Sequence, residues 1–169
     1  MGAAKRQVRT AIKLWFMDED PVSIHTLASA AHEIIHTLFK RKGLSDLLFD
    51  SDIIKDEYRG EWAKRLKADA TFFKHAQRDP EAVKEFDPSV NEYLLLFCVA
   101  GLGKMGEPLG DIETTFLTWF GIQHPDFLFK DIYSKVIAID QLENMRGMKR
   151  QKFFDLYCQR LLMERRIGG

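Results

Sequence analysis

The sequence predicts an all-α protein: a single-domain bundle of six or seven helices over residues 1–169. Three observations support this fold class. Apolar residues recur at spacings of three and four, capping residues and glycines divide the chain into segments of helical length, and strand patterns and internal repeats are absent. With 46% hydrophobic and 12% aromatic residues, the chain can bury one sizeable core.

The first predicted helix covers residues 4–17 and ends at an acidic run, Asp18-Glu19-Asp20. Asp20 is expected to cap the second helix, which begins at Pro21 and stops at Gly43. The core face of this second helix carries Ile24, Leu27, Ala28, Ala31, Ile35 and Leu38. A third helix is expected over residues 54–73.

The fourth helix is expected to be the buried centre of the bundle, because residues 93–102 are apolar on every side. Ser89 followed by Glu92 predicts a capping box at its start. Asp111 is expected to cap a fifth helix that Gly121 closes, and Asp126 to cap a sixth through Val136 and Ile137.

The last predicted helix runs over residues 148–166 and is strongly basic. Its cations interleave with Phe153, Phe154, Tyr157 and Leu161. We interpret this pattern as an amphipathic helix that docks its aromatic side, with a nucleic-acid or acidic-partner surface as the alternative.

Charge and cysteine content limit the classes of partner. The 25 Lys and Arg balance the 25 Asp and Glu, so no global field favours a polyanion and any nucleic-acid contact must be local. Both cysteines, Cys98 and Cys158, fall in apolar helical patterns, and no secretory signal or membrane-spanning run is present. We therefore expect reduced thiols, a cytoplasmic location and no membrane association.

The motif with the clearest chemical meaning is His32-Glu33-Ile34-Ile35-His36. On a helix it places two imidazoles one turn apart, so His32 and His36 could hold Zn²⁺ while Glu33 acts as the catalytic base. A third ligand could come from Glu57 or Glu61, whereas the metzincin extension is excluded because Phe39 and Lys42 replace its Gly and His. The alternative is that these histidines lie at the edge of the hydrophobic core and bind no metal.

A polar groove is predicted where the second and third helices meet. His25 shares a stripe with Ser29, His32 and His36, and Arg65 and His75 share one on the third helix. His25, Arg65, His75 and Arg78 are the candidate ligand- or partner-binding residues. The alternative for His75 and Arg78 is a purely structural role, because the negative end of a helix dipole favours cations near a helix C-terminus.

A glycine pattern from Gly101 to Gly106 matches the dinucleotide-binding fingerprint. That fingerprint needs a strand before it and a helix after it, but Pro108 and Gly110 follow at once. We interpret these glycines as the end of the buried fourth helix.

Two segments, residues 20–28 (DPVSIHTLA) and residues 72–80 (FFKHAQRDP), resemble small bacterial helical proteins of unassigned function. The resemblance covers about two-thirds of the chain. It implies a helical fold, assigns no catalytic residues and does not include Glu33 or His36. More distantly, the chain resembles HEPN proteins in topology only, because Arg65 and His75 are too far apart for the Arg–His pair of that family.

The sequence therefore favours a non-catalytic ligand- or partner-binding bundle, with homodimer formation open. The alternatives are a zinc-dependent hydrolase, and a HEPN-like RNA-associated protein that uses the basic last helix. No cofactor is expected, although zinc is the candidate if one is bound.

Overall fold

A computed structural model describes residues 1–44, 69, 71–73, 81, 83, 85–124 and 145–167. Every regular element in these ranges is a helix, which confirms the predicted all-α class. The helices with defined bounds are α1 (Gly2–Phe16), α2 (Pro21–Arg41), α4 (Val90–Lys104), α5 (Asp111–Gln123) and α7 (Arg150–Ile167). Residues 71–73 form one further helical turn. The predicted sixth helix and most of the third lie outside the described residues.

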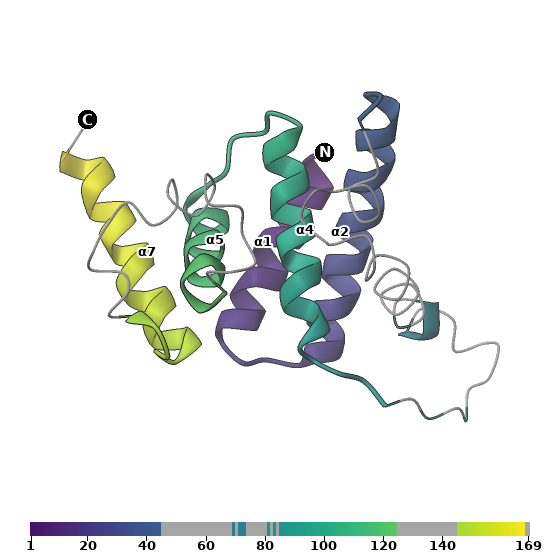
Figure 1. The fold of residues 1–169 in the computed structure, drawn as a ribbon, viewed down its shortest axis with the longest axis horizontal. Coiled ribbons are helices and arrows are strands. Elements are labelled where there is room, and N and C mark those ends of the chain that lie inside the picture. The colour runs from purple at the N-terminus through teal and green to yellow at the C-terminus, as the bar shows by residue number, and fades with distance from the viewer. Residues whose placement is uncertain are drawn as a thin grey trace.

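Helices α1, α2 and α4 lie side by side, with α5 and α7 beyond α1 (Figure 1). Helix α4 starts where α2 starts, since Asn91 Nδ2 donates to the Pro21 carbonyl at 2.8 Å. The two helices also end together, where Lys42 Nζ donates to the Met105 carbonyl at 3.2 Å. Helices α2 and α4 are therefore parallel, and α1 runs against both.

Helix α4 is buried on all sides, as predicted from its apolar run. Its buried residues include Leu94, Leu95, Leu96, Phe97, Cys98, Val99 and Leu102. Its close contact with α2 is marked by the Cys98 thiol, which donates to the Ala28 carbonyl at 3.5 Å. Of the six predicted core positions of α2, Ile24, Ala28, Ala31 and Ile35 are buried, and Leu27 and Leu38 are partly buried.

The predicted cap of α2 is confirmed. The Asp20 carboxylate accepts from the Val22 and Ser23 backbone N–H groups, and Pro21 is the first helical residue. Hydrogen bonds from Ser23 lower the pKa of Asp20, so the carboxylate stays ionised beside the positive end of the helix dipole. At the other end Gly43 adopts a φ of +69°, which favours glycine and stops the helix.

The predicted capping box of α4 is wrong. Ser89 makes no capping bond to the helix, because its hydroxyl donates to Asp87 at 2.7 Å. Glu92 does not reach back either, since its carboxylate bonds His124 Nε2 at 2.5 Å. Tertiary partners therefore take both side chains away from the local motif.

The start of α5 also differs from the prediction. Asp111 is the first helical residue, and Gly110 stands at the cap position. The buried Glu113 carboxylate accepts from the Gly110 N–H at 3.1 Å and from Arg9 Nε at 2.7 Å, which ties α5 to α1. A Cβ at Gly110 would lie 2.9 Å from the Arg9 guanidinium, so a larger residue there would require the Arg9 side chain to shift. Gly121, the predicted stop, lies inside the helix, which continues to Gln123.

The glycine pattern forms the end of a helix, as predicted. Gly101 and Gly103 lie inside α4, and Gly106 follows it with a φ of +79°. No strand precedes these glycines in the described ranges.

Helix α7 docks through its aromatic side, as the amphipathic interpretation predicted. Phe153 is fully buried and stacks on both Phe16, at a centroid distance of 6.4 Å, and Tyr157, at 5.5 Å. Leu156 and Met163 stay exposed. None of the helices that the structure describes is long and apolar enough to cross a membrane.

The two thiols are free, and we expect them to differ in reactivity toward a disulfide reagent such as DTNB. Burial raises the pKa of Cys98 far above that of an ordinary thiol, so almost no thiolate forms at pH 8 and Cys98 should not react in the folded protein. Burial also raises the pKa of Cys158, although a hydrogen bond with Thr115 opposes the shift. Cys158 should therefore react slowly. A Cys158→Ser variant that still releases one equivalent while folded would contradict the burial of Cys98.

Candidate functional site

The HEIIH motif lies on α2, and its three polar side chains differ in exposure. His32 is buried, His36 is half-buried and Glu33 is exposed. The two imidazole rings lie almost parallel, with an interplanar angle of 20° and centroids 5.8 Å apart. The helix thus brings the histidines together as their spacing predicts.

The third zinc ligand is not placed by the structure, because Glu57 and Glu61 lie outside the described residues. Within the described ranges, no three His, Cys, Asp or Glu side chains gather closely enough to hold a metal ion. Zinc binding by His32 and His36 with Glu33 as base stays a prediction.

Protein purified without a histidine tag is expected to contain less than one zinc ion per chain. Two helix-borne histidines provide only half of a tetrahedral site, and so added chelator should change the midpoint of thermal unfolding little. Metal content by mass spectrometry and a thermal melt with and without chelator measure both quantities. One tightly held zinc per chain that disappears in His36→Ala would contradict this and favour the hydrolase alternative.

His25 lies in the interior rather than at an open surface. Its ring is fully buried against Phe73, at a centroid distance of 5.8 Å, and Phe86, at 5.1 Å. Its Nδ1 lies 2.9 Å from Asn91 Oδ1. Since the Asn91 amide nitrogen donates to the Pro21 carbonyl, the amide oxygen must face His25, and His25 Nδ1 must carry the proton. This network joins the starts of α2 and α4.

Replacing Asn91 with alanine is expected to leave the buried His25 Nδ1–H without this acceptor and to lower the free energy of unfolding by about 1 to 3 kcal/mol. Chemical denaturation followed by circular dichroism measures the change. An exposed asparagine would cost almost nothing, so a loss well below this range would show that the network does not hold α2 and α4 together.

The other predicted binding residues, Arg65, His75 and Arg78, lie outside the described residues. So does most of the predicted groove between the second and third helices. In that region the structure shows the rings of Phe73 and Phe86 packed against His25. The assignment of these residues to ligand binding stays a prediction.

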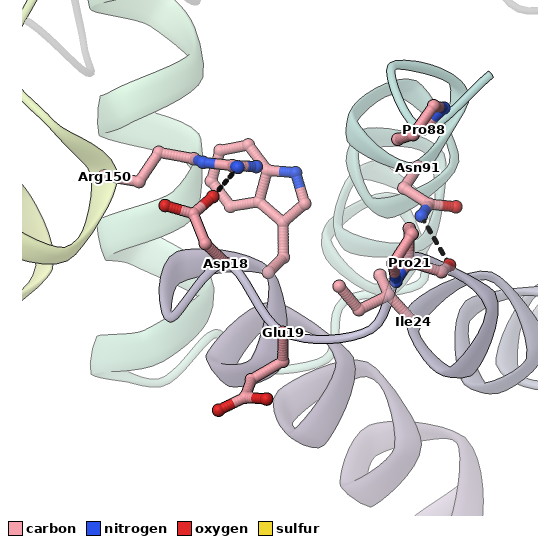
Figure 2. A pocket seen from close by; sticks show the side chains of 8 residues that line it. Asp18, Glu19, Pro21, Ile24, Pro88, Asn91 and Arg150 are labelled. Atoms are coloured by element: carbon pink, nitrogen blue, oxygen red, sulfur yellow. Dashed lines mark hydrogen bonds and ion pairs between the residues drawn. The ribbon is translucent and has the colours of Figure 1, made fainter.

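An open pocket lies at the opposite end of α2 from Gly43, beside the turn that joins α1 to α2 (Figure 2). Its volume is about 210 Å³. We call it the junction pocket; its lining residues are Trp15, Asp18, Glu19, Pro21, Ile24, Pro88, Asn91 and Arg150. Four separate segments provide these residues: the end of α1 with its turn, the start of α2, the start of α4 and the start of α7.

One wall of the junction pocket is a layer formed by Trp15, Asp18 and Arg150. The Arg150 guanidinium lies 4.6 Å from the centre of the Trp15 ring. It also forms an ion pair with Asp18, which Figure 2 shows. Partial burial lowers the pKa of Arg150. An arginine always carries its charge in proteins, so this cation needs both the carboxylate and the indole face.

The rim of the junction pocket is acidic. Asp18, Glu19 and Asp20 follow each other in the turn, and all three are exposed. Asp18 adopts a φ of +56°, a conformation that Asp and Asn tolerate better than most residues. Of these three, Asp18 and Glu19 line the pocket, together with one cation, Arg150. The remaining lining is largely apolar, because the polar atoms of Asn91 are taken by His25 and Pro21.

No sequence pattern predicted this pocket. Asp18 and Glu19 indicated only a helix boundary, and Arg150 indicated only one cation of a basic helix. No local pattern links residues 18 and 150, so a signal in the sequence alone could not have paired them.

No family model, curated protein or solved structure matches this chain. The resemblance to small bacterial helical proteins and to HEPN topology therefore stays an expectation. Since no relative supplies a role for any residue, we infer the function from the chemistry of the described residues.

Proposed function

We propose that this protein is a non-catalytic binding protein whose junction pocket takes a basic side chain of a partner protein. Lysine and arginine combine an apolar stem with a charged head. The pocket offers the matching surfaces, since Pro21 and Pro88 can contact the stem while the acidic rim receives the head. The proposal narrows the partner-binding function that the sequence favours.

The contact made by Arg150 is the observation that carries this proposal. Its guanidinium already lies over Trp15 and pairs with Asp18, so this wall is suited to a cation on an aromatic face. Glu19 is exposed in the same turn. Figure 2 shows its carboxylate pointing away from the Asp18–Arg150 pair, so it is a carboxylate that Arg150 does not use.

The size and composition of the pocket favour binding over catalysis. A volume of about 210 Å³ is below the ~300–1,000 Å³ of typical small-molecule sites, so one side chain fits better than a cofactor. The lining contains the carboxylates Asp18 and Glu19 but no histidine, cysteine, serine or threonine, so it offers no hydroxyl or thiol nucleophile beside an imidazole base.

Nuclear magnetic resonance titration with short blocked peptides tests the proposal. The probes are acetyl-Gly-Lys-Gly-amide, its arginine analogue, and acetyl-Gly-Glu-Gly-amide as the charge-reversed control. We expect the two basic peptides to shift the Trp15 indole N–H and the backbone signals of Asp18 and Ile24. The glutamate peptide should leave these signals unchanged.

A matched pair of variants localises the effect. Asp18→Asn with Glu19→Gln removes two rim charges, and asparagine keeps the positive φ at position 18 acceptable. This variant should weaken binding of the basic peptides, whereas Glu33→Gln, an exposed carboxylate elsewhere on α2, should not. Equal shifts with the glutamate peptide, or equal weakening in both variants, would refute the proposal.

A further inference from the structure

Three helix ends meet at the pole of the α1–α2–α4 group farthest from the junction pocket. The start of α1 is joined to the residues after α4 by the Lys5–Glu107 ion pair, with 2.6 Å between Nζ and Oε2. The end of α2 is joined to α4 by the hydrogen bond from Lys42 to the Met105 carbonyl. Figure 1 shows the N-terminus beside the ends of α2 and α4.

This pole is strongly basic. We call it the basic pole; its cations are Lys5, Arg6, Lys40, Arg41, Lys42 and Lys104. All but the partly buried Lys5 are exposed, and in the described part of the chain Glu107 is the carboxylate that faces them. Glu107 is itself engaged, because the hydrogen bond from Lys5 and the charges of Lys5 and Lys42 lower its pKa.

Helix dipoles explain only part of this charge. Each helix C-terminus carries about half a negative charge, so the ends of α2 and α4 together offset about one cation. Glu107 offsets a second, so even without Lys40 the described residues of the pole keep an excess of about three positive charges. Lys5 and Arg6 moreover lie near the start of α1, where the dipole disfavours cations and the first turn contains no acidic residue. The ion pair with Glu107 accounts for Lys5, but helix stability does not account for Arg6.

The overall neutrality of the chain hides this separation of charge. The 25 positive and 25 negative side chains cancel in total, but Asp18, Glu19, Asp20 and Asp87 lie at the opposite pole. A local field of one sign can attract a polyanion even when the net charge is zero. The basic last helix, which the sequence indicated as the alternative nucleic-acid surface, has fewer cations available for a partner, since Arg150 pairs with Asp18. Arg146, just before this helix, donates to the Ile122 carbonyl.

We propose that the basic pole binds the phosphate backbone of double-stranded nucleic acid without reading its sequence. Cations from three helix ends can contact phosphates, and such contacts position a duplex but do not identify bases. Sequence-tolerant binding of single strands uses exposed aromatic residues for base stacking. Among the described residues of this pole the aromatic side chain is Phe39, which is buried. An anionic membrane would need apolar groups to insert, and Leu44 is the one large apolar side chain exposed here among the described residues.

Fluorescence anisotropy with the full chain and a labelled duplex, either RNA or DNA, tests this proposal over about 50 to 200 mM salt. The variant Arg6→Gln/Arg41→Gln/Lys104→Gln removes three cations that make no ion pair in the described ranges. Each lost phosphate contact should reduce the slope of log affinity against log salt by about 0.9, so the triple variant should reduce it by about 2.7. Its affinity at low salt should fall by about tenfold or more.

The control variant Lys13→Gln/Lys149→Gln/Lys152→Gln removes the same number of exposed cations elsewhere and should keep the slope of the wild-type protein. Equal loss in both variants would overturn the assignment to the basic pole. Absence of duplex binding at low salt would overturn it as well. Binding to phosphatidylserine vesicles in place of the duplex would assign the pole to membranes, and salt-sensitive self-association without duplex binding would assign it to a second copy of the chain.

Discussion

Truncating either Leu95 or Leu96 to alanine is expected to lower the free energy of unfolding by about 2 to 5 kcal/mol. The two side chains are 0% and 1% exposed, although neighbouring residues on a helix point about 100° apart. Both can be buried only because helices surround α4. Each truncation removes apolar atoms from the core and leaves a cavity that the neighbours fill only in part.

Urea denaturation followed by circular dichroism measures both variants. Leu156→Ala is the matched control, because Leu156 is 46% exposed on α7 and its truncation should change stability by only about 0.5 kcal/mol. If α4 were an amphipathic surface helix, one of the two core variants would behave like the control. That outcome would contradict the central position of α4.

Replacing Phe16 with alanine should cost about 3 to 5 kcal/mol, the range for a fully buried phenylalanine. Phe16 ends α1 and contacts rings from two other helices: Phe116 of α5 at a centroid distance of 6.4 Å, and Phe153 and Phe154 of α7 at 6.4 and 4.8 Å. Its loss should therefore loosen α7 as well as destabilise the core. Arg150 at the start of α7 should then leave Trp15.

Hydrogen exchange and denaturation together separate these two effects. Amide protection along α7 should fall more than protection along α4, since α7 depends on this aromatic contact. A loss of protection spread evenly over all helices would show that α7 docks through other contacts. Phe154→Ala provides a comparison on α7 itself, because Phe154 is only partly buried.

Local sequence patterns predicted the helices well wherever one helix turn contained all the information. Asp20 followed by Pro21 predicted the start of α2, and the structure shows both residues in those roles. The same reasoning failed at Ser89 and Glu92, because Asp87 and His124 compete for their side chains. It also failed at Asp111, where Glu113 supplies the bond to the Gly110 N–H. A capping motif describes only what a side chain can do, and tertiary neighbours decide whether it does so.

At the candidate site, too, local spacing predicted some features and tertiary contacts decided others. The spacing of His32 and His36 predicted that their rings would meet, since residues four apart share a helix face. The same spacing placed His25 on a groove, whereas the structure buries it against Phe73 and Phe86. A helical repeat identifies a face but not the elements that cover it.

By itself, the sequence determined the all-α class, the bounds of most described helices and the buried position of α4, because these depend on apolar spacing and local capping. Only the tertiary structure decided the Arg9–Glu113 pair, the contact of Arg150 with Trp15 and Asp18, and the gathering of cations at the basic pole. The first two join residues more than one hundred positions apart, and the basic pole combines three separate stretches of the chain. Such contacts depend on how the helices cross and dock, which no local pattern of side chains records.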